Sequence, residues 1–497
     1  MRHRNVSDST LFFPGAVGKA LSGRRIMSSF LHIMRCGVLA LAASLAACAV
    51  PDADQSIAES SAGSTPVIQG ADGPLSPAAS AALIASLDGG AEGSPVLQHH
   101  LKVEEAIGGS PLTTDNAVEV LRDGDQTFAA IGKAISEARE TLNLEYYTIE
   151  DVTLTTPDGN ARQLADMLVA KLQQGVAVNI IYDSYGSIDT PRDVFDRLGK
   201  AGAKLLDFHP VDPNPANVID GNDRDHRKIL VADGRIAVIG GVNLSKSYES
   251  KSPGSDDDEE DPQTGLPAHW RDTSIRIEGP AVAEIQKLFF DHWKNEGGPT
   301  IDETHYFPKP EAKGHHIVRV IGSSPEQEIS RYYVTLISAL RSAESKAWIS
   351  NAYFVPTPEE VETLIAAAKR GVDVRLLVPE KSDAGPAVEA ARSHYSELLD
   401  AGVKIYETRD VVLHSKTVAI DGVWSAIGSS NFDHRSVLFN DEIDAVVIGR
   451  KTAEDLEAIF KDGEQTAVAI DRESWEKQRR FMDRMRGFWA RLMEGLL

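Results

Sequence analysis

Cysteine is almost missing from this chain of 497 residues, which contains only Cys36 and Cys48. Cys36 falls inside an N-terminal segment that has the pattern of an export signal, so the exported chain would keep Cys48 alone. One cysteine cannot form an internal disulfide. The scarcity therefore excludes a disulfide framework and, because Cys48 is expected to be lipidated, thiol catalysis as well.

Positive charge is also scarce, with 51 lysines and arginines against 74 acidic residues and a formal net charge of −23. Nucleic-acid-binding proteins usually display a basic surface. The acidic balance therefore argues against a nucleic-acid partner, although a small cationic pocket can exist inside an acidic protein.

The longest apolar run near the N-terminus is short. Residues 35–48, "RCGVLALAASLAAC", combine a cationic residue, an apolar stretch and small residues before Cys48. A bilayer-spanning helix needs about 20 apolar residues, so this run predicts a cleaved signal. The ending "LAAC" resembles a bacterial lipobox, which predicts cleavage before Cys48 and lipidation of that cysteine, on the periplasmic face of the inner or outer membrane. A plain secretory signal is the alternative, and Met27 is an alternative start.

The segment that follows has few aromatic residues and many Ala, Ser, Gly and Pro. Such a composition favours disorder, so we expect a flexible tether over 48–97. The remaining boundaries that we predict are a first domain at 98–300, a second domain at 301–470 and a C-terminal helix at 471–497.

The two predicted domains repeat each other. Strand-like segments at 142–151 and 347–356 are each followed by a helix that ends at glycine and leads into a buried strand. A second helix and strand follow in each half. Alternation of this kind predicts βαβ units and a largely parallel sheet in each half of an α/β protein.

A motif occurs twice with identical internal spacing, as "HRKILVADGRIAVIGGVN" at 226–243 and "HSKTVAIDGVWSAIGSSN" at 414–431. Asp-Gly between two apolar runs predicts a strand, a tight turn and a returning strand. Residues two apart on a strand share a face, so His226 and Lys228 point the same way, as do His414 and Lys416. The returning strands end in small residues followed by Asn243 and Asn431.

One imidazole, one ammonium and one amide per copy suit a phosphate better than a metal ion. Two copies supply a nucleophile and an acid on opposite sides of one phosphorus, with cations around its oxygens. The duplication therefore predicts a single phosphodiester site that is built from both halves.

The repeated pattern HxKxxxxDxxxxxxG(G/S)xN resembles the phospholipase D superfamily, and "NAYFVP", "WRDTSIRIEGP" and "GSSNFDHRS" resemble bacterial cardiolipin synthases within it. The resemblance covers roughly residues 115–497. It implies two α/β/α sandwich domains, a covalent phosphatidyl-histidine intermediate and no cofactor or metal.

Carried over position by position, the resemblance makes His226 and His414 the nucleophile and the general acid, with His226 favoured as nucleophile by family precedent alone. It makes Lys228, Lys416, Asn243, Ser429 and Asn431 the phosphate-binding residues. The motif aspartates Asp233 and Asp421 are counted with the catalytic set, although the hairpin turn alone also explains them.

A catalytic imidazole needs an acceptor on its far nitrogen. The resemblance places Glu442 of "FNDEID" in that role. In the first half the candidate is Asp272, where aspartate replaces the family's glutamate and the spacing is longer because of an acidic insert at 250–267, which we expect to be a solvated loop.

The last segment places an apolar stripe (Phe481, Met485, Trp489, Leu492, Leu496) among arginines. A basic amphipathic helix suits an anionic membrane surface, and packing on the domain is the alternative. The expected partners are thus a phosphatidylglycerol-like phospholipid and a membrane surface, with no nucleic acid.

We therefore expect a phosphatidyltransferase of the cardiolipin synthase type. A hydrolytic phospholipase D shares every residue named above and is the main alternative. A nuclease fits the charge less well, and a non-catalytic lipid-binding scaffold would require a degraded motif, which neither copy shows.

Overall fold

The structure, a computed structural model, describes residues 67–87, 110–211, 222–249, 265–267, 269–327 and 329–478, together with Ala53, Ile57 and Leu97. All of them lie in the unit Val50–Leu497. The predicted signal with Cys36 and Cys48, nearly all of the acidic insert and the apolar stripe of the C-terminal helix lie outside the described residues. No helix in the described part of the chain is long and apolar enough to cross a membrane.

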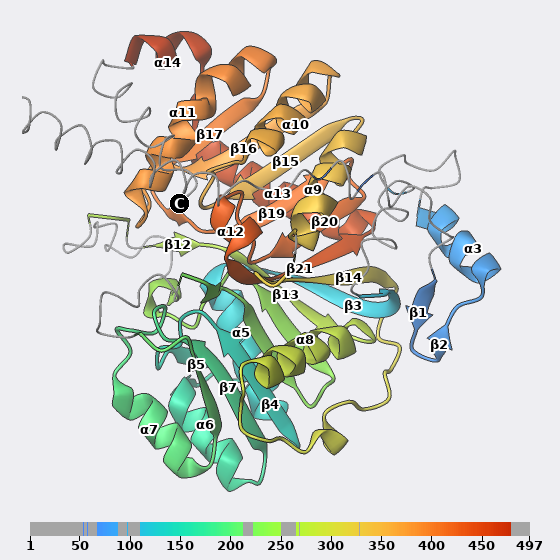
Figure 1. Cartoon of the computed structure of the whole chain (residues 1–497), viewed down its shortest axis with the longest axis vertical. Coiled ribbons are helices and arrows are strands. Elements are labelled where there is room, and N and C mark those ends of the chain that lie inside the picture. The colour runs from blue at the N-terminus through green and yellow to red at the C-terminus, as the bar shows by residue number, and fades with distance from the viewer. Residues whose placement is uncertain are drawn as a thin grey trace, which may run out of the picture. The chain divides into compact units, whose positions relative to one another are not determined.

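The first half contains most of the elements that the sequence predicts (Figure 1). Its main elements are β3 (Leu112–Arg122), α5 (Asp123–Glu137), β4 (Thr141–Tyr146), β5 (Thr153–Thr155), β6 (Ala161–Gln163), α6 (Leu164–Gln173), β7 (Ala177–Asp183), α7 (Arg192–Ala201), β8 (Lys204–Phe208), β9 (Arg224–Asp225), β10 (Lys228–Ala232), β11 (Ile236–Gly240), β12 (Trp270–Arg271), β13 (Thr273–Glu278) and α8 (Ala281–Asn295).

The second half repeats this order. Its main elements are β14 (His316–Ser323), α9 (Arg331–Ser342), β15 (Lys346–Asn351), α10 (Pro358–Lys369), β16 (Asp373–Pro379), α11 (Gly385–Ala401), β17 (Lys404–Thr408), β18 (Val412–Leu413), β19 (Lys416–Ile420), β20 (Trp424–Gly428), α12 (His434–Leu438), β21 (Asn440–Ile448), α13 (Arg450–Thr466), β22 (Val468–Ile470) and α14 (Arg472–Gln478).

The glycines that end the predicted helices have the backbone that this role requires. Gly175 after α6 and Gly371 after α10 adopt φ of 87° and 97°, and Gly202 after α7 and Gly402 after α11 adopt φ of 108° and 96°. Glycine reaches this left-handed region without steric cost and lets the chain turn from helix into strand. The predicted helix–glycine–strand units are therefore confirmed in both halves.

The expectation of a largely parallel sheet is wrong, because each half has a mixed sheet. In the first half β4, β7 and β8 are parallel, whereas the pairs β4–β10, β10–β11, β11–β13 and β13–β3 are antiparallel. The second half has the same arrangement, with β15, β16 and β17 parallel and β19, β20, β21 and β14 antiparallel. The hairpin motif itself supplies the antiparallel strands.

The two half-sheets are joined where β3 pairs with β14. Helices α5, α6 and α7 pack on one face of the first half-sheet and α8 packs on the other. Helices α9, α10 and α11 cover the second half-sheet, which has α13 on its opposite face. Each half is thus an α/β/α sandwich, and a core cluster containing Ile229, Ile275, Ile427 and Ile443 is shared between them.

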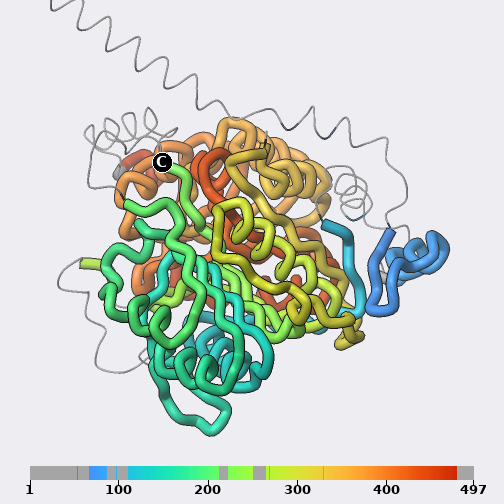
Figure 2. Tube along the Cα trace, turned by 60° about the horizontal axis from the view of Figure 1, so that its bottom comes forward, coloured from blue at the N-terminus to red at the C-terminus, as the bar shows by residue number. Residues whose placement is uncertain are grey.

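The flexible-tether prediction is wrong over residues 67–87. There β1 (Ile68–Gly70) pairs with β2 (Gly73–Pro74) and with β3, and is followed by α3 (Pro77–Leu87). Figure 2 shows this blue segment beside the start of β3. Ile68 is fully buried, and Leu83 and Ile84 pack against the core of the second half. A few apolar side chains and two strand pairings order a segment whose overall composition favours disorder.

Candidate active site

The two motifs meet at one pocket of about 550 Å³, whose lining includes His226, His414, Asn243 and Asn431. Both hairpins form as predicted, with antiparallel pairing of β10 with β11 and of β19 with β20. Because each histidine directly precedes the first strand of its hairpin, the two imidazoles arrive at the junction of the halves. The structure therefore brings the motif residues of both halves to a single site, as predicted.

His226 is held by a carboxylate of the other half. Its Nδ1 lies 3.1 and 3.0 Å from the two carboxylate oxygens of Glu442 on β21. An ionised carboxylate only accepts hydrogen bonds, so Nδ1 carries the hydrogen and Nε2 is left for the substrate. Burial and the charges of Lys228 and Lys416 hold the pKa of His226 well below its ordinary value, which favours the neutral, nucleophilic ring.

Glu442 is itself fixed by three donors. It accepts hydrogen bonds from the hydroxyl of Ser429, from the hydroxyl of Ser436 at 2.8 Å and from the amide of Asn440 at 3.1 Å. The side chain is fully buried, and burial raises the pKa of Glu442 to about 7. A carboxylate with this many bonds has one available position, so it orients the imidazole that it contacts.

His414 has a different environment. Its Nδ1 lies 2.7 Å from Oδ2 of Asp272 and 2.8 Å from the hydroxyl oxygen of Tyr248. The ring of Trp270 lies beside it, with centroids 5.4 Å apart. Burial and the Lys416 charge lower the pKa of His414.

The carboxylates are exchanged between the halves. His226 of the first half contacts Glu442 of the second half, and His414 of the second half contacts Asp272 of the first half. The backbone follows the same crossed pattern, because the N–H of His226 donates to the carbonyl of Asp441 and that of His414 donates to the carbonyl of Arg271. Neither half alone therefore contains His226 together with Glu442 or His414 together with Asp272.

Lys228 and Lys416 are almost fully buried and lie outside the pocket lining, and the Nζ of each donates to the carbonyl of the histidine two residues before it. The Nζ of Lys416 lies 3.1 Å from Nε2 of His414, and that of Lys228 lies 5.5 Å from the ring centre of Tyr147. Burial lowers the pKa of Lys228 to about 7 and that of Lys416 to about 8. A phosphate anion beside them would favour their charged forms, so both lysines suit phosphate binding.

The two asparagines lie where the sequence predicts and the serine does not. Asn243 and Asn431 line the pocket, and Asn243 accepts a hydrogen bond from the Thr148 N–H through Oδ1. Ser429 is fully buried with its hydroxyl on Glu442 and is outside the pocket lining. This geometry gives the Ser429 hydroxyl a carboxylate partner, and its phosphate-binding role stays a prediction.

The motif aspartates are also outside the pocket lining. Asp233 and Asp421 sit in the turns at the far ends of β10 and β19, both with φ of 52°. The Asp233 carboxylate accepts hydrogen bonds from the N–H groups of Arg139, Glu140 and Thr141. Asp421 binds the backbone before β15 in the same way. Both hold the start of a neighbouring strand, and this geometry gives no support to the catalytic role predicted for them.

Several pocket residues were not predicted. They are the aromatic residues Tyr147, Tyr185, Tyr248, Trp270 and Tyr353, the arginines Arg224 and Arg435, and Asp383. None stands in the repeated motif of 226–243 and 414–431, although Tyr147 and Tyr353 lie in the repeated strand segments 142–151 and 347–356. Only the chain's folding brings them to the two histidines.

Both halves of the chain match the same family of known proteins. The family model described as the phospholipase D-like domain of cardiolipin synthase matches residues 131–252 and again residues 336–463, once for each half. A cardiolipin synthase of Geobacillus sp. (strain WCH70) is 34% identical over 397 residues, which cover 78% of this chain and 74% of the relative. Cardiolipin synthase 2 of Bacillus anthracis is 32% identical over 375 residues, which cover 75% of this chain and 69% of the relative.

Among solved structures, phosphatidylserine synthase of Haemophilus influenzae Rd KW20 superposes with a TM-score of 0.53 at 11% identity, covering 76% of this chain and 95% of that one. At that identity the likeness shows the fold alone. Two matched halves, relatives above 30% identity across most of the chain and a shared fold agree with one another. The chain therefore belongs to the phospholipase D superfamily, within its cardiolipin synthase-like family of phosphatidyltransferases.

Proposed function

We propose that this pocket transfers the phosphatidyl group of a phosphatidylglycerol-like lipid to an alcohol acceptor through a covalent phosphohistidine. The observation that carries the proposal is the crossed pair of buried histidines, each with a carboxylate of the other half on Nδ1. That arrangement presents two imidazoles to one phosphorus, with Nε2 of His226 opposite its carboxylate-bound Nδ1 and Nε2 of His414 beside the Lys416 ammonium.

In the first step Nε2 of His226 attacks phosphorus and forms a P–N bond, while the bond between phosphorus and the leaving alcohol breaks. His414 supplies the proton that the leaving oxygen takes up. In the second step neutral His414 removes the proton from the acceptor hydroxyl, whose oxygen attacks phosphorus as the P–N bond breaks. Each histidine returns to its starting protonation state.

The remaining residues stabilise charge. Lys228 and Lys416 face the non-bridging oxygens, and the amides of Asn243 and Asn431 orient them. Glu442 stabilises the positive charge that His226 acquires on bonding to phosphorus, and Asp272 does the same for protonated His414. The charge neutralisation that divalent ions provide in many phosphodiesterases is assigned here to the two lysines.

The test uses labelled phosphatidylglycerol in detergent micelles, with and without added glycerol, followed by separation of the lipids. We expect labelled cardiolipin, and we expect His226→Ala and His414→Ala each to lose several orders of magnitude in turnover. Phosphatidic acid as the sole product would make the chain a hydrolase, and near-normal turnover by either variant would refute the shared site.

We further propose that the protein is an exported lipoprotein anchored through Cys48, with its C-terminal helix on the same membrane surface at the periplasmic face. Support comes from the sequence, namely the signal pattern ending in "LAAC" and the basic amphipathic segment. The variant Cys48→Ser should lose lipidation and remain unprocessed or be released. If it stayed membrane-bound at the normal mature mass, the anchoring proposal would be wrong.

A further inference from the structure

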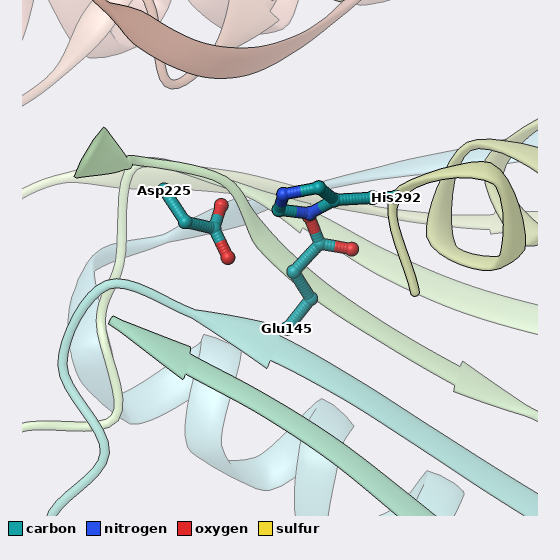
Figure 3. Close-up of side chains that lie close together, drawn as sticks. All are labelled: Glu145, Asp225 and His292. Carbon is teal, nitrogen blue, oxygen red and sulfur yellow. The ribbon is translucent and has the colours of Figure 1, made fainter. Parts of the chain in front are cut away.

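Five charged or titratable side chains lie together on the far side of the strand that carries His226. They are Glu145 on β4, Asp225 on β9, Arg227, His292 on α8 and Asp441 on β21, and we call them the ionic network. Each is at most 7% exposed. Figure 3 shows Glu145, Asp225 and His292, with the imidazole over one carboxyl group and the other carboxyl group facing it.

Arg227 joins the two halves through this network. Its guanidinium donates to Glu145 of the first half at 3.2 Å and to the Asp441 carboxylate of the second half at 2.9 Å. It also donates to two second-half carbonyls, those of Glu442 and Ser323, each at 3.2 Å. His292 completes the set, with Nδ1 2.8 Å from Glu145.

The network touches the peptide from which the catalytic carboxylate projects. Neighbouring residues of a strand point to opposite faces, so Asp441 reaches Arg227 while Glu442 reaches His226. The carbonyl of Glu442 is bound by Arg227, and the carbonyl of Asp441 is bound by the N–H of His226. A shift of Arg227 would therefore move Glu442 relative to the imidazole.

The second half provides an internal control. In the repeated motif Leu413 replaces Asp225 and Ser415 replaces Arg227, and the strand register places Ser350 where the first half has Glu145. Ser415 makes a hydroxyl contact with Thr273 at 3.3 Å. The second half adopts the same fold without these charges, so the fold does not require them. Buried charges are costly to desolvate, which indicates another reason for their presence.

The network is balanced without a metal ion, although Glu145, Asp225 and His292 are spaced as metal ligands could be. Burial opposes ionisation of Glu145, but His292 and Arg227 hold its pKa below the ordinary value. Glu145 in turn outweighs burial and raises the pKa of His292 to about 9. Burial raises the pKa of Asp225 well above its ordinary value, which favours its neutral form. Arg227 and protonated His292 then match Glu145 and Asp441.

We propose that the ionic network positions the His226–Glu442 pair and makes it chemically different from the His414–Asp272 pair. Arg227 and His292 are positioning residues in this scheme, because neither lines the pocket. The inference rests on the proposed role of His226. The two motifs are nearly identical, yet their histidines have unequal roles. The proposal attributes this difference to the buried charges that surround only the first motif.

The test compares Arg227→Lys, which keeps the charge but not the four bonds, with His292→Asn, whose amide can still donate to Glu145. The matched control is Ser415→Ala, at the position of the second motif that corresponds to Arg227. We expect kcat to fall about 10- to 100-fold in the first two variants, since a displacement near 1 Å can cost that much. KM should stay within about threefold, and the control should keep wild-type values.

A second readout needs no turnover. In spectra of ¹³C-histidine-labelled protein, assigned with the His226→Ala and His414→Ala variants, the His226 titration should move in Arg227→Lys and the His414 titration should not. Should Arg227→Lys fail to fold, His292→Asn gives the same comparison.

Three results would overturn the proposal: wild-type kcat and an unchanged His226 titration despite a lower Tm, equal movement of both histidines, or a stoichiometric divalent ion that Asp225→Asn loses. Failure of the proposed function would look different, because His226→Ala would then retain activity whatever the network variants did.

Discussion

Replacing Glu442 by glutamine tests how much of the turnover depends on the carboxylate charge that contacts Nδ1 of His226. Glutamine has nearly the same shape, and Ser429, Ser436 and Asn440 remain around it. A hydrogen bond to a charged partner contributes about 1.5–3 kcal/mol. Because Glu442 is fully buried, we expect the upper part of that range, about 2–3 kcal/mol. This corresponds to a fall in kcat of about 30- to 150-fold.

The assay measures cardiolipin formed from labelled phosphatidylglycerol over a range of substrate concentrations. Glu442 is outside the pocket lining, so KM should stay within about threefold. The control is Asp444→Asn, two residues along the same strand. Asp444 is also buried and hydrogen-bonded to Ser430, but burial raises its pKa to about 8, so the neutral amide replaces a neutral acid. It should keep kcat within about twofold.

The structure also suggests a second substitution that should restore part of the activity lost when Glu442 is shortened. In the first half Gly241 occupies the position of Ser429, and a Cβ there would lie 2.1 Å from Oδ1 of Asp272. The first half thus combines the shorter side chain of aspartate with glycine, and the second half combines the longer side chain of glutamate with serine. We expect Glu442→Asp to lose activity and the double variant Glu442→Asp/Ser429→Gly to regain part of it. Retention of more than a third of wild-type kcat by Glu442→Gln would refute the reasoning.

Three other outcomes are expected. EDTA should leave turnover unchanged because Lys228 and Lys416 neutralise the phosphate, and chelator inhibition reversed by one particular metal would contradict this. Asp233→Asn should lower the free energy of unfolding in urea by about 1 kcal/mol, as capping residues do, while kcat stays constant; a large loss of kcat would restore a catalytic role. The folded state binds the Asp444 proton more tightly than the unfolded state does, so its contribution to stability is complete below pH 4 and disappears as pH rises to about 8. Asp444→Asn should therefore flatten the pH dependence of Tm over that range, and an unchanged profile would show that Asp444 does not titrate there.

The repeated motif predicted much of the site because its information is local. A strand period of two places His226 with Lys228, and Asp-Gly specifies the hairpin, whose turn residues Asp233 and Gly234 both adopt positive φ. The helix–glycine–strand units were equally local. These parts of the fold needed no knowledge of distant residues.

What the sequence could not supply depends on contacts between distant segments. The pairing of β3 with β14 and the burial of Ile68 are such contacts. The local pattern of Ser429 suits a phosphate ligand, and only the arrival of Glu442 from β21 gives its hydroxyl another partner. Arg227 lies between two predicted catalytic residues, yet strand alternation turns it toward charges from four other elements.

The exchanged carboxylates determine when the enzyme can become active during its own synthesis. The first half emerges from the ribosome with His226 but without Glu442, and with Asp272 but without the histidine that Asp272 serves. Until residue 442 has been made and β21 has folded, His226 of a nascent chain lacks the carboxylate that orients it for attack on a lipid. The chain order thus delays phospholipid chemistry until the polypeptide is nearly complete.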